Sequence, residues 1–319
     1  VNAGPDDVMI NEGSGMTGVV NKFQRILGLK LPEKFLDKVT ISKEERPVVF
    51  ISHMEHHSNH TSWLETVADV ECLMPDERGL IDVDHFRKVL KQYEDRPTKI
   101  ASITACSNVT GIQTCYQQLA RIMHECGGYI FVDFAASAPY VKIDMHPADP
   151  MEKLDAIYFS PHKFLGGPGS SGVLVFNERI YDRELPPSMS AGGTVDYVGM
   201  TDQDFISRIE EREKAGTPGV LQTLKAGLVF QIKDAVGTDV INKREHEFTD
   251  RALRSWGENS DIVILGNPDP GSRVGIISFN IRNVNGKYLH HKFLTVLLND
   301  LFGIQSRAGC SCAGPVSYT

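Results

Sequence analysis

The stretch DAIYFSPHKFLGGPGSSGVL, residues 155–174, decides the predicted fold. Residues 156–159 are a short apolar run that predicts a buried strand, and a serine and a proline end it immediately before His162 and Lys163. In open α/β sheets ligands bind at the carboxyl ends of the strands, and a lysine held among apolar groups becomes a usable amine nucleophile. A solvated surface lysine is the commoner outcome. The interpretation of Lys163 therefore depends on what lies at the neighbouring strand ends.

Length and composition favour a globular protein of about two domains. The chain has 319 residues, 41% hydrophobic and 23% charged, and no apolar run long enough to span a bilayer. A net charge of -8 argues against nucleic acid or an anionic membrane as the main partner. The six cysteines lack a paired zinc-ribbon spacing, which favours reduced thiols in the cytoplasm. Because the sequence opens with Val1 and runs directly into a predicted strand, we expect further sequence upstream.

Apolar strands alternate with amphipathic helices through the first two thirds of the chain. This pattern is typical of a mostly parallel sheet covered on both faces, and it predicts the α/β class. The predicted strands are 6–10, 47–52, 67–73, 99–105, 129–132 and 156–159, and the predicted helices are 19–27, 83–93 (with Asp82 as N-cap) and 114–126.

The pattern changes to α+β near the carboxyl end. A helix over 220–236 leads out of the first domain, and helices 243–256 and 288–301 with strands 262–265 and 274–281 follow it. We therefore predict a large domain over residues 1–236 and a smaller one over 237–319.

The glycine loop GSGMTG, residues 13–18, fits the pattern GxGxxG between a strand and a helix. Its backbone N–H groups and the helix dipole suit a phosphate, although a plain glycine turn is an alternative. A dinucleotide fold requires an acidic residue about 20 positions later, at the end of the next strand. The next strand here, 47–52, lies too far downstream, so the loop favours a phosphate rather than a dinucleotide.

Four histidines, His53, His56, His57 and His60, lie in the segment HMEHHSNH. On a helix they would share a face, which is a legitimate zinc or iron hypothesis. The segment begins as a loop after a strand, however, and only Glu55 could add a carboxylate ligand, so we favour no metal. A histidine just past a strand end can instead stack on a flat ring or move a proton.

Two further polar residues follow strand ends at the same predicted edge. Asp133 ends the strand YIFVD and Asn108 lies in the turn SNVTG. A helix cap and ordinary loop chemistry are the alternatives. A buried carboxylate can also keep a pyridinium nitrogen protonated, which pyridoxal phosphate needs as an electron sink. A phosphate loop, an imidazole, an amide, a carboxylate and a lysine thus converge on one edge.

These residues resemble those of the class V aminotransferases, in particular the group of cysteine desulfurases and selenocysteine lyases. The resemblance runs from about residue 13 to 315 and is specific at SPHK, VDFAAS, EHH, SNVTG, AGTP and RAGCSC. It implies a pyridoxal phosphate fold of type I, with a mostly parallel seven-stranded sheet, a smaller C-terminal α+β domain, and a homodimer with shared active sites.

The resemblance also implies a role for each matching residue. Lys163 resembles the lysine that forms an imine with the cofactor, and Asp133 the partner of the pyridine nitrogen. His56 matches the ring-stacking residue and proton shuttle. Arg307 resembles the arginine that binds the substrate carboxylate, and Cys312 the cysteine that takes the sulfur. The remaining cofactor residues are the phosphate ligands Gly15, Met16, Thr17, Ser160, His162 and, from the other subunit, Thr217, with Asn108 near the ring hydroxyl.

The sequence departs from the family pattern at three points. Ala136 stands where a glutamine near the ring hydroxyl is usual, so that hydrogen bond is lost or supplied by water. Cys310 and Ser311 stand where histidines often precede the reactive cysteine; Cys310 either joins Cys312 in redox or sulfur-relay chemistry or packs as a small apolar residue. A second carboxylate-binding arginine, expected after the last cysteine, is absent.

The leading hypothesis is a pyridoxal phosphate enzyme with cysteine desulfurase or selenocysteine lyase chemistry. It acts on a small amino acid and releases alanine, and a sulfur-acceptor protein is a further candidate partner. An aminotransferase using a 2-oxo acid is the closest alternative. A metal hydrolase built on the histidine cluster, a nucleotide-dependent oxidoreductase and a non-catalytic sulfur-carrier scaffold complete the set.

Overall fold

A seven-stranded sheet forms the centre of the computed structural model, which describes residues 1–314 and all of their side chains except those of residues 36 and 37. The strand order is β1-β7-β6-β5-β4-β2-β3. Only β7 runs antiparallel to its neighbours, and the other pairs are parallel, so the predicted mostly parallel sheet is confirmed. The strands are β1 Asp7–Glu12, β2 Val48–Ser52, β3 Asp69–Leu73, β4 Lys99–Thr104, β5 Tyr129–Asp133, β6 Ala156–Phe159 and β7 Gly172–Asn177.

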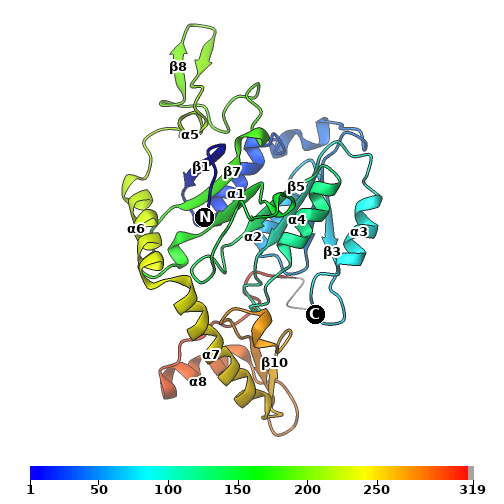
Figure 1. Cartoon of the computed structure of the whole chain (residues 1–319), viewed down its shortest axis with the longest axis vertical. Helices are drawn as coiled ribbons and strands as arrows, with labels where there is room; N and C mark the ends of the chain where they lie inside the picture. The colour runs from blue at the N-terminus through cyan, green and yellow to red at the C-terminus, as the bar shows by residue number, and fades with distance from the viewer. Residues whose placement is uncertain (315–319) are drawn as a thin grey trace.

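Helices cover both faces of this sheet (Figure 1). Successive residues of β2 point to opposite faces, and every one of them is buried, as expected for a central parallel strand. Phe50 packs in a core with Phe86 of α3, whereas Ile51 packs in a second core with Phe23 of α1 and Trp63 of α2. The helices are α1 Gly15–Ile26, α2 His57–Leu64, α3 Val83–Lys91 and α4 Tyr116–Glu125.

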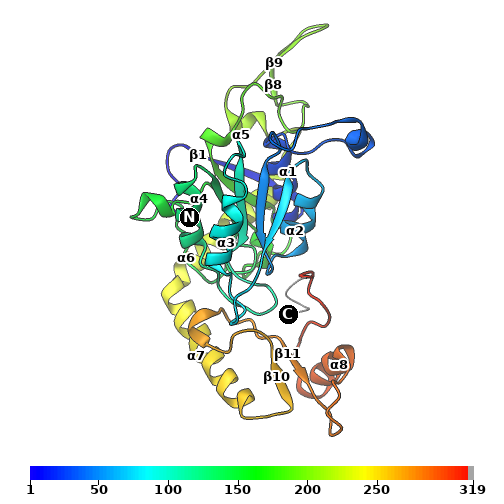
Figure 2. The ribbon, with the colours of Figure 1, turned by 90° about the vertical axis from the view of Figure 1, so that its right-hand side faces the viewer.

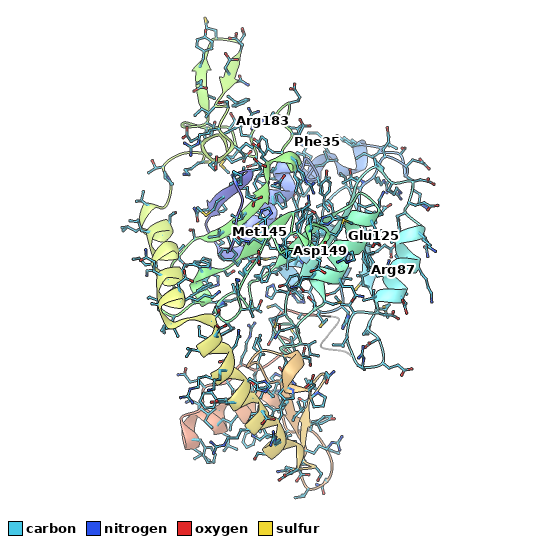
Figure 3. The ribbon with its side chains drawn as sticks, in the orientation of Figure 1. Phe35, Arg87, Glu125, Met145, Asp149 and Arg183 are labelled. Atoms are coloured by element: carbon cyan, nitrogen blue, oxygen red, sulfur yellow. The ribbon has the colours of Figure 1, made fainter. Side chains whose placement is uncertain are left out.

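The local sequence explains where α3 begins and which of its faces is buried. Asp82 caps the helix as predicted, because its carboxylate accepts a hydrogen bond of 2.8 Å from the His85 N–H. Phe86 lies in the core, and Arg87, the next residue, is exposed. Arg87 lies 3.4 Å from Glu125 of α4, and Figure 3 shows both side chains on the outer side of the molecule.

The smaller C-terminal part follows two consecutive helices. α6 Val220–Val236 and α7 Thr238–Gly257 are separated by Gly237, whose φ of 84° breaks the helix. Beyond them lie β10 Ile262–Ile264, β11 Phe279–Ile281 and α8 His291–Phe302. In both views this part lies beyond one end of the sheet, and the hairpin of β8 Val195–Val198 and β9 Gln203–Phe205 projects from the other (Figure 1, Figure 2).

The remaining elements are short: α5 Ile209–Arg212 and the 3-10 helices η1 Glu33–Lys38, η2 Pro150–Glu152, η3 Pro161–Lys163, η4 Glu178–Ile180 and η5 Pro270–Ser272. Among the described helices none combines the length and apolar character needed to cross a membrane.

Several boundaries differ from the sequence prediction. The strand predicted over 274–281 is limited to β11, because Val274 bonds instead to Gly111, with 2.9 Å from its N–H to the carbonyl oxygen. The helix predicted from residue 288 begins at His291, because the Leu289 N–H bonds to Ile281 and extends the pairing of β11. The strands β7, β8 and β9 were not predicted.

The loop after β4 is tied to the C-terminal part. Besides the bond between Val274 and Gly111, the Gln113 N–H donates to the Ser272 carbonyl at 2.8 Å, and the buried Arg273 guanidinium donates to the Thr110 and Ile276 carbonyls. A side chain at Gly111, where φ is +76°, would place its Cβ 2.5 Å from the Ile276 oxygen. The close approach therefore requires glycine.

Candidate active site

The carboxyl ends of the parallel strands surround a cavity of about 150 Å³. Loops after five strands contribute to its wall, as expected for an open α/β sheet. The lining residues are Ser14, Met16 and Thr17 after β1, His56 and Ser58 after β2, Thr104, Cys106 and Asn108 at β4, Asp133, Ala135 and Ala136 at β5, and Ser160, His162 and Lys163 after β6. Most of the predicted site residues are thus brought together, and Ser58, Thr104 and Cys106 are additional to the prediction.

Lys163 and Asp133 form an ionisable pair at the base of this cavity. Asp133 is the last residue of β5, and it accepts a hydrogen bond of 2.7 Å from the Ala135 N–H. Burial raises the pKa of Asp133 to about 6, against the effects of that N–H and of the Lys163 ammonium. Burial likewise lowers the pKa of Lys163, while the Asp133 carboxylate opposes that shift. The lysine is therefore closer to its neutral, nucleophilic form than a surface lysine.

The amino end of α1 forms one wall of the cavity. Ser14 is its N-cap residue but makes no capping hydrogen bond through its side chain, and the first turn holds no acidic residue. The Met16 N–H donates to Ser160 Oγ at 2.8 Å, which joins this turn to the end of β6. A Cβ at Gly15 would lie 2.4 Å from the His162 ring. The first turn thus offers backbone donors for an anion beside Ser160 and His162.

His56 presents a neutral imidazole to the cavity. Its Nδ1 accepts from the Ser58 N–H at 3.1 Å, and the residue caps α2. Burial lowers the pKa of His56 to about 4, and the nearby charges of Lys163 and His57 add to this effect. The Ser58 hydroxyl lies 2.7 Å from the Thr17 hydroxyl, which connects α2 to the turn that begins α1. A neutral flat ring held in this way can stack on an aromatic ligand.

A buried carboxyl below the cavity holds these strand ends in place. Glu55 accepts hydrogen bonds from the Ser52 hydroxyl at 2.6 Å, the Thr104 N–H at 2.8 Å and Asn59 Nδ2 at 2.6 Å. Burial raises the pKa of Glu55 to about 8, although each of these bonds favours the carboxylate. Glu55 therefore connects the end of β2, the helix α2 and the end of β4 immediately beside His56.

The same network continues across the sheet. The Asn59 Oδ1 accepts from the Ser102 hydroxyl at 2.7 Å, the Tyr158 hydroxyl at 2.8 Å and Trp63 Nε1 at 3.1 Å. All four side chains are buried. Because buried polar groups are costly when unpaired, this dense pairing fixes the floor of the cavity. We call the residues Ser52, Glu55, Asn59, Trp63, Ser102, Thr104 and Tyr158 the floor network.

The histidine cluster is divided between different environments. His53 Nε2 faces the Gly79 carbonyl at 3.2 Å, whereas His56 faces the cavity. Within residues 1–314, no group of three or more histidine, cysteine or acidic side chains is placed to bind a metal ion.

Arg307 and Cys312 lie in a loop that is hydrogen-bonded to the cavity wall at Asn108. The Cys312 carbonyl accepts from the His57 N–H at 2.7 Å, and the Ser311 carbonyl accepts from Asn108 Nδ2 at 2.7 Å. Arg307 Nη2 lies 3.6 Å from the Cys312 sulfur, and its charge also acts on Lys163. Asn108 Oδ1 is buried and has no hydrogen-bond partner among residues 1–314, so it is available to accept a hydrogen bond from an occupant of the cavity.

Thr217 does not line this cavity. It lies in an adjoining groove of about 840 Å³, which shares Ser14 and His162 with the cavity wall. The hydroxyls of Ser170 and Ser171, which line the groove, are buried and have no hydrogen-bond partner within the described part of the chain. Ala136 lines the cavity itself, and its methyl group provides no hydrogen bond there.

Comparison with known proteins identifies relatives over nearly the whole chain. The family model described as Aminotransferase class-V matches residues 36–319. A probable cysteine desulfurase of Halalkalibacterium halodurans is 32% identical over 272 residues, which are 84% of this chain and 62% of that protein. A cysteine desulfurase of Haloferax volcanii is 31% identical over 275 residues, 84% of this chain and 60% of that protein. The chain thus spans less than two thirds of the length of these relatives.

Solved structures show the same fold at lower identity. The apo structure of a cysteine desulfurase from Thermococcus onnurineus NA1 superposes with a TM-score of 0.77 at 21% identity, over 98% of this chain and 71% of that one. A cysteine desulfurase from Escherichia coli gives a TM-score of 0.75 at 20% identity, over 97% of this chain and 70% of that one. Both likenesses establish the fold.

Proposed function

Because the chain belongs to the class V aminotransferase family, which depends on pyridoxal phosphate, we propose that it removes sulfur or selenium from cysteine or selenocysteine and releases alanine. One observation carries the proposal. A thiol, Cys312, lies beside a guanidinium in a loop that is hydrogen-bonded to Asn108, and Asn108 lines the same cavity as Lys163 and Asp133. A transaminase has no use for that thiol, whereas a desulfurase requires it as nucleophile.

The residues of the cavity fit pyridoxal phosphate. We infer that the first turn of α1, with Ser160 and His162, binds the phosphate, and that His56 stacks on the ring. Asp133 would hold the pyridine nitrogen, and the unpaired Asn108 Oδ1 would gain a polar partner from the bound group. When bound, the cofactor supplies an electron sink for the substrate's α-carbon.

The protein's own groups then perform the proton and sulfur transfers. The Lys163 amine, whose pKa burial lowers, removes the α-proton of the substrate. The Cys312 thiolate attacks the substrate sulfur, the carbon–sulfur bond breaks, and the carbon fragment leaves as alanine after protonation. Cys312 keeps the sulfur as a persulfide. Arg307, 3.6 Å from the Cys312 sulfur, provides a planar donor for the substrate carboxylate.

We further propose a homodimer with shared sites. One face of α6 exposes Leu221, Leu224, Leu228 and Ile232, which recur at helical spacing. A second copy covering this stripe would bring Thr217, just before α6, towards the phosphate end of the other subunit's cavity. The groove that contains Thr217 already adjoins that end in one subunit.

The division into a large part up to residue 236 and a smaller part from 237 also stays a proposal, supported by the break at Gly237. We propose a sulfur-acceptor protein as the second partner, because the terminal sulfur of the Cys312 persulfide has to be transferred before the next turnover. A reducing compartment such as the cytoplasm suits a thiol that must stay reduced.

The decisive experiment combines spectroscopy with chemical trapping. Protein incubated with pyridoxal phosphate should absorb in the visible, and borohydride should fix the cofactor to the peptide containing Lys163. L-cysteine should then yield alanine. Lys163→Ala should abolish the absorbance, the adduct and the alanine, whereas Lys88→Ala, on the exposed side of α3, should change none of them. Attachment at another lysine would refute the assignment.

The dimer proposal has a separate test. Leu224→Asp places a charge in the apolar stripe and should convert the dimer into monomers in sedimentation analysis, with weaker retention of cofactor. Leu64→Asp, at the exposed end of α2, serves as the matched control. A wild-type protein that sediments as a monomer would contradict the proposal.

A further inference from the structure

Two cysteines lie two positions apart in a tight turn next to Asn108 of the cavity wall. The Ala313 N–H donates to the Cys310 carbonyl at 3.2 Å, which closes a turn over residues 310–313. Its central residues, Ser311 and Cys312, have φ values of 52° and 59°. Positive φ at both central residues is typical of a type I′ turn, for which glycine and asparagine are the favoured residues. The turn is therefore strained, and contacts from elsewhere must maintain it.

Those contacts come from the strand ends that form the cavity. The Asn108 amide donates to the Ser311 carbonyl and the His57 N–H donates to the Cys312 carbonyl, both at 2.7 Å. The two strained residues are thus the two whose carbonyls are anchored. Strain maintained in this way is a recurrent property of functional sites.

The turn places the two thiols in different surroundings. Cys312 is partly buried, with its sulfur 3.6 Å from Arg307, whereas Cys310 is exposed to solvent. A left-handed helical backbone at Ser311 brings the Cα atoms of its two neighbours to roughly 5.5 Å from each other, from helix geometry. That separation lies within the range of about 4.4–6.8 Å found between the Cα atoms of disulfide-bonded cysteines, so the two side chains can approach each other closely.

We propose that Cys310 is a second sulfur carrier, which accepts the terminal sulfur from the Cys312 persulfide and presents it to the acceptor outside the cavity. The proposal rests on the desulfurase activity proposed above. It gives a function to the sequence Cys310-Ser311-Cys312, which that activity alone leaves unexplained.

The transfer needs no reactant beyond those already present. The Cys310 thiol loses its proton to solvent, and its thiolate attacks the terminal sulfur of the Cys312 persulfide. The sulfur–sulfur bond at Cys312 breaks as a new one forms at Cys310, and the electron pair leaves with the Cys312 sulfur. The adjacent Arg307 guanidinium favours that released thiolate. Sulfur moves from one cysteine to the other without net oxidation.

The experiment follows the sulfur through a single turnover. Full-length protein loaded with pyridoxal phosphate is mixed with one equivalent of L-cysteine per site, without reductant. Samples are quenched with iodoacetamide at increasing times, and mass spectrometry locates the extra sulfur on the peptide that contains both cysteines. Alanine is measured in the same samples. The persulfide should appear on Cys312 first and then mostly on Cys310.

Two variants test the role of Cys310 directly. In Cys310→Ser the sulfur should remain on Cys312. Repeated turnover with 2-mercaptoethanol as acceptor should slow by about tenfold or more, because the acceptor must then reach Cys312 instead of an exposed neighbouring thiol. Cys115→Ser, before α4 and outside the cavity, should behave as the wild type. If Cys310→Ser does not bind cofactor, the wild-type time course decides alone.

Three outcomes would overturn the relay. Alanine could form while the persulfide stays on Cys312 at every time, Cys310→Ser could turn over at the wild-type rate, or a Cys310–Cys312 disulfide could form with release of sulfide, which means attack on the inner sulfur instead. Each of these leaves the desulfurase proposal intact. A wild-type protein that forms no alanine would overturn both proposals.

Discussion

The floor network and the loop over residues 307–312 belong to one site but differ in how firmly they are held. In the floor network the Glu55 carboxyl receives three short hydrogen bonds, and its partners are buried in the sheet. In the loop the anchoring consists of two backbone carbonyls, held by Asn108 and His57, while the outer cysteine meets solvent. The first arrangement orients groups that must not move. The second holds a nucleophile that has to exchange sulfur with other molecules.

This difference predicts that damage to the two regions will be detected by different measurements. Loss of a floor residue should lower the free energy of unfolding, because buried donors then lack acceptors. Loss of a loop residue should lower turnover and leave stability nearly unchanged, because exposed groups contribute little to stability.

Among variants of the loop, the largest effect on turnover is expected for Cys312→Ser. A hydroxyl is a far weaker sulfur acceptor than a thiolate, so alanine formation from cysteine should fall by at least about 10³-fold. Cofactor absorbance and the urea midpoint should stay close to the wild-type values. Activity within tenfold of the wild type would show that the thiol is dispensable, and amino transfer to an added 2-oxo acid would then identify an aminotransferase.

The largest effect on stability is expected for Glu55→Leu. The substitution leaves the Ser52 hydroxyl, the Thr104 N–H and the Asn59 amide buried without an acceptor. The free energy of unfolding should fall by roughly 3–5 kcal/mol. Urea titration measures this change, with Glu77→Leu on the surface as control. A loss below about 1 kcal/mol would mean that the floor rearranges freely.

Asp133→Asn should make the cofactor-free protein more stable in a pH-dependent way. The pKa of Asp133 is raised to about 6 in the folded state, so the contribution of Asp133 to the free energy of unfolding is fully present at low pH. This contribution falls as the pH rises and the unfolded chain ionises. The contribution lost between about pH 4 and pH 6 is roughly 3 kcal/mol. The variant should therefore be more stable than the wild type at pH 8 and equal to it near pH 4, while it binds cofactor less well. An equal difference at both pH values would contradict the raised pKa.

The smallest of these effects is expected for Asn108→Ala. It removes one hydrogen bond to the Ser311 carbonyl, which is worth about 1 kcal/mol, so the rate of persulfide formation should fall about fivefold. The free energy of unfolding should change less than in Glu55→Leu. A stability loss as large as that of Glu55→Leu would place the loop anchor with the rigid floor.

The sequence predicted the sheet better where its strands are parallel. Strands such as β2 and β5 are continuous apolar runs ended by polar residues, which is a strong local signal. β7 was missed because it follows directly on the glycine run and its antiparallel pairing with β1, more than 150 residues earlier, has no local signature. β8 and β9 are only three or four residues long and largely exposed, too short for a periodic pattern.

The candidate site was predictable to the extent that its residues end strands. Asp133, Lys163 and Asn108 belong to this group, and the structure brings them to one cavity. Glu55 was considered only as a metal ligand, because its burial depends on Thr104, which is far away in the sequence. Thr217 was named only through the family resemblance; it lies in the adjoining groove, and its contribution to another subunit's cavity belongs to the dimer proposal.

The hydrogen bonds from Val274 to Gly111 and from Arg273 to Thr110 give the smaller C-terminal part a role in positioning the cavity wall. The loop that carries Asn108 is held on one side by the sheet and on the other side by hydrogen bonds with the segment after η5. A shortened chain ending at residue 236 would lose these hydrogen bonds together with the cysteine turn, so the loop that carries Asn108 would have no contacts on its outer side. The smaller part therefore supports the loop after β4, which forms part of the cavity wall.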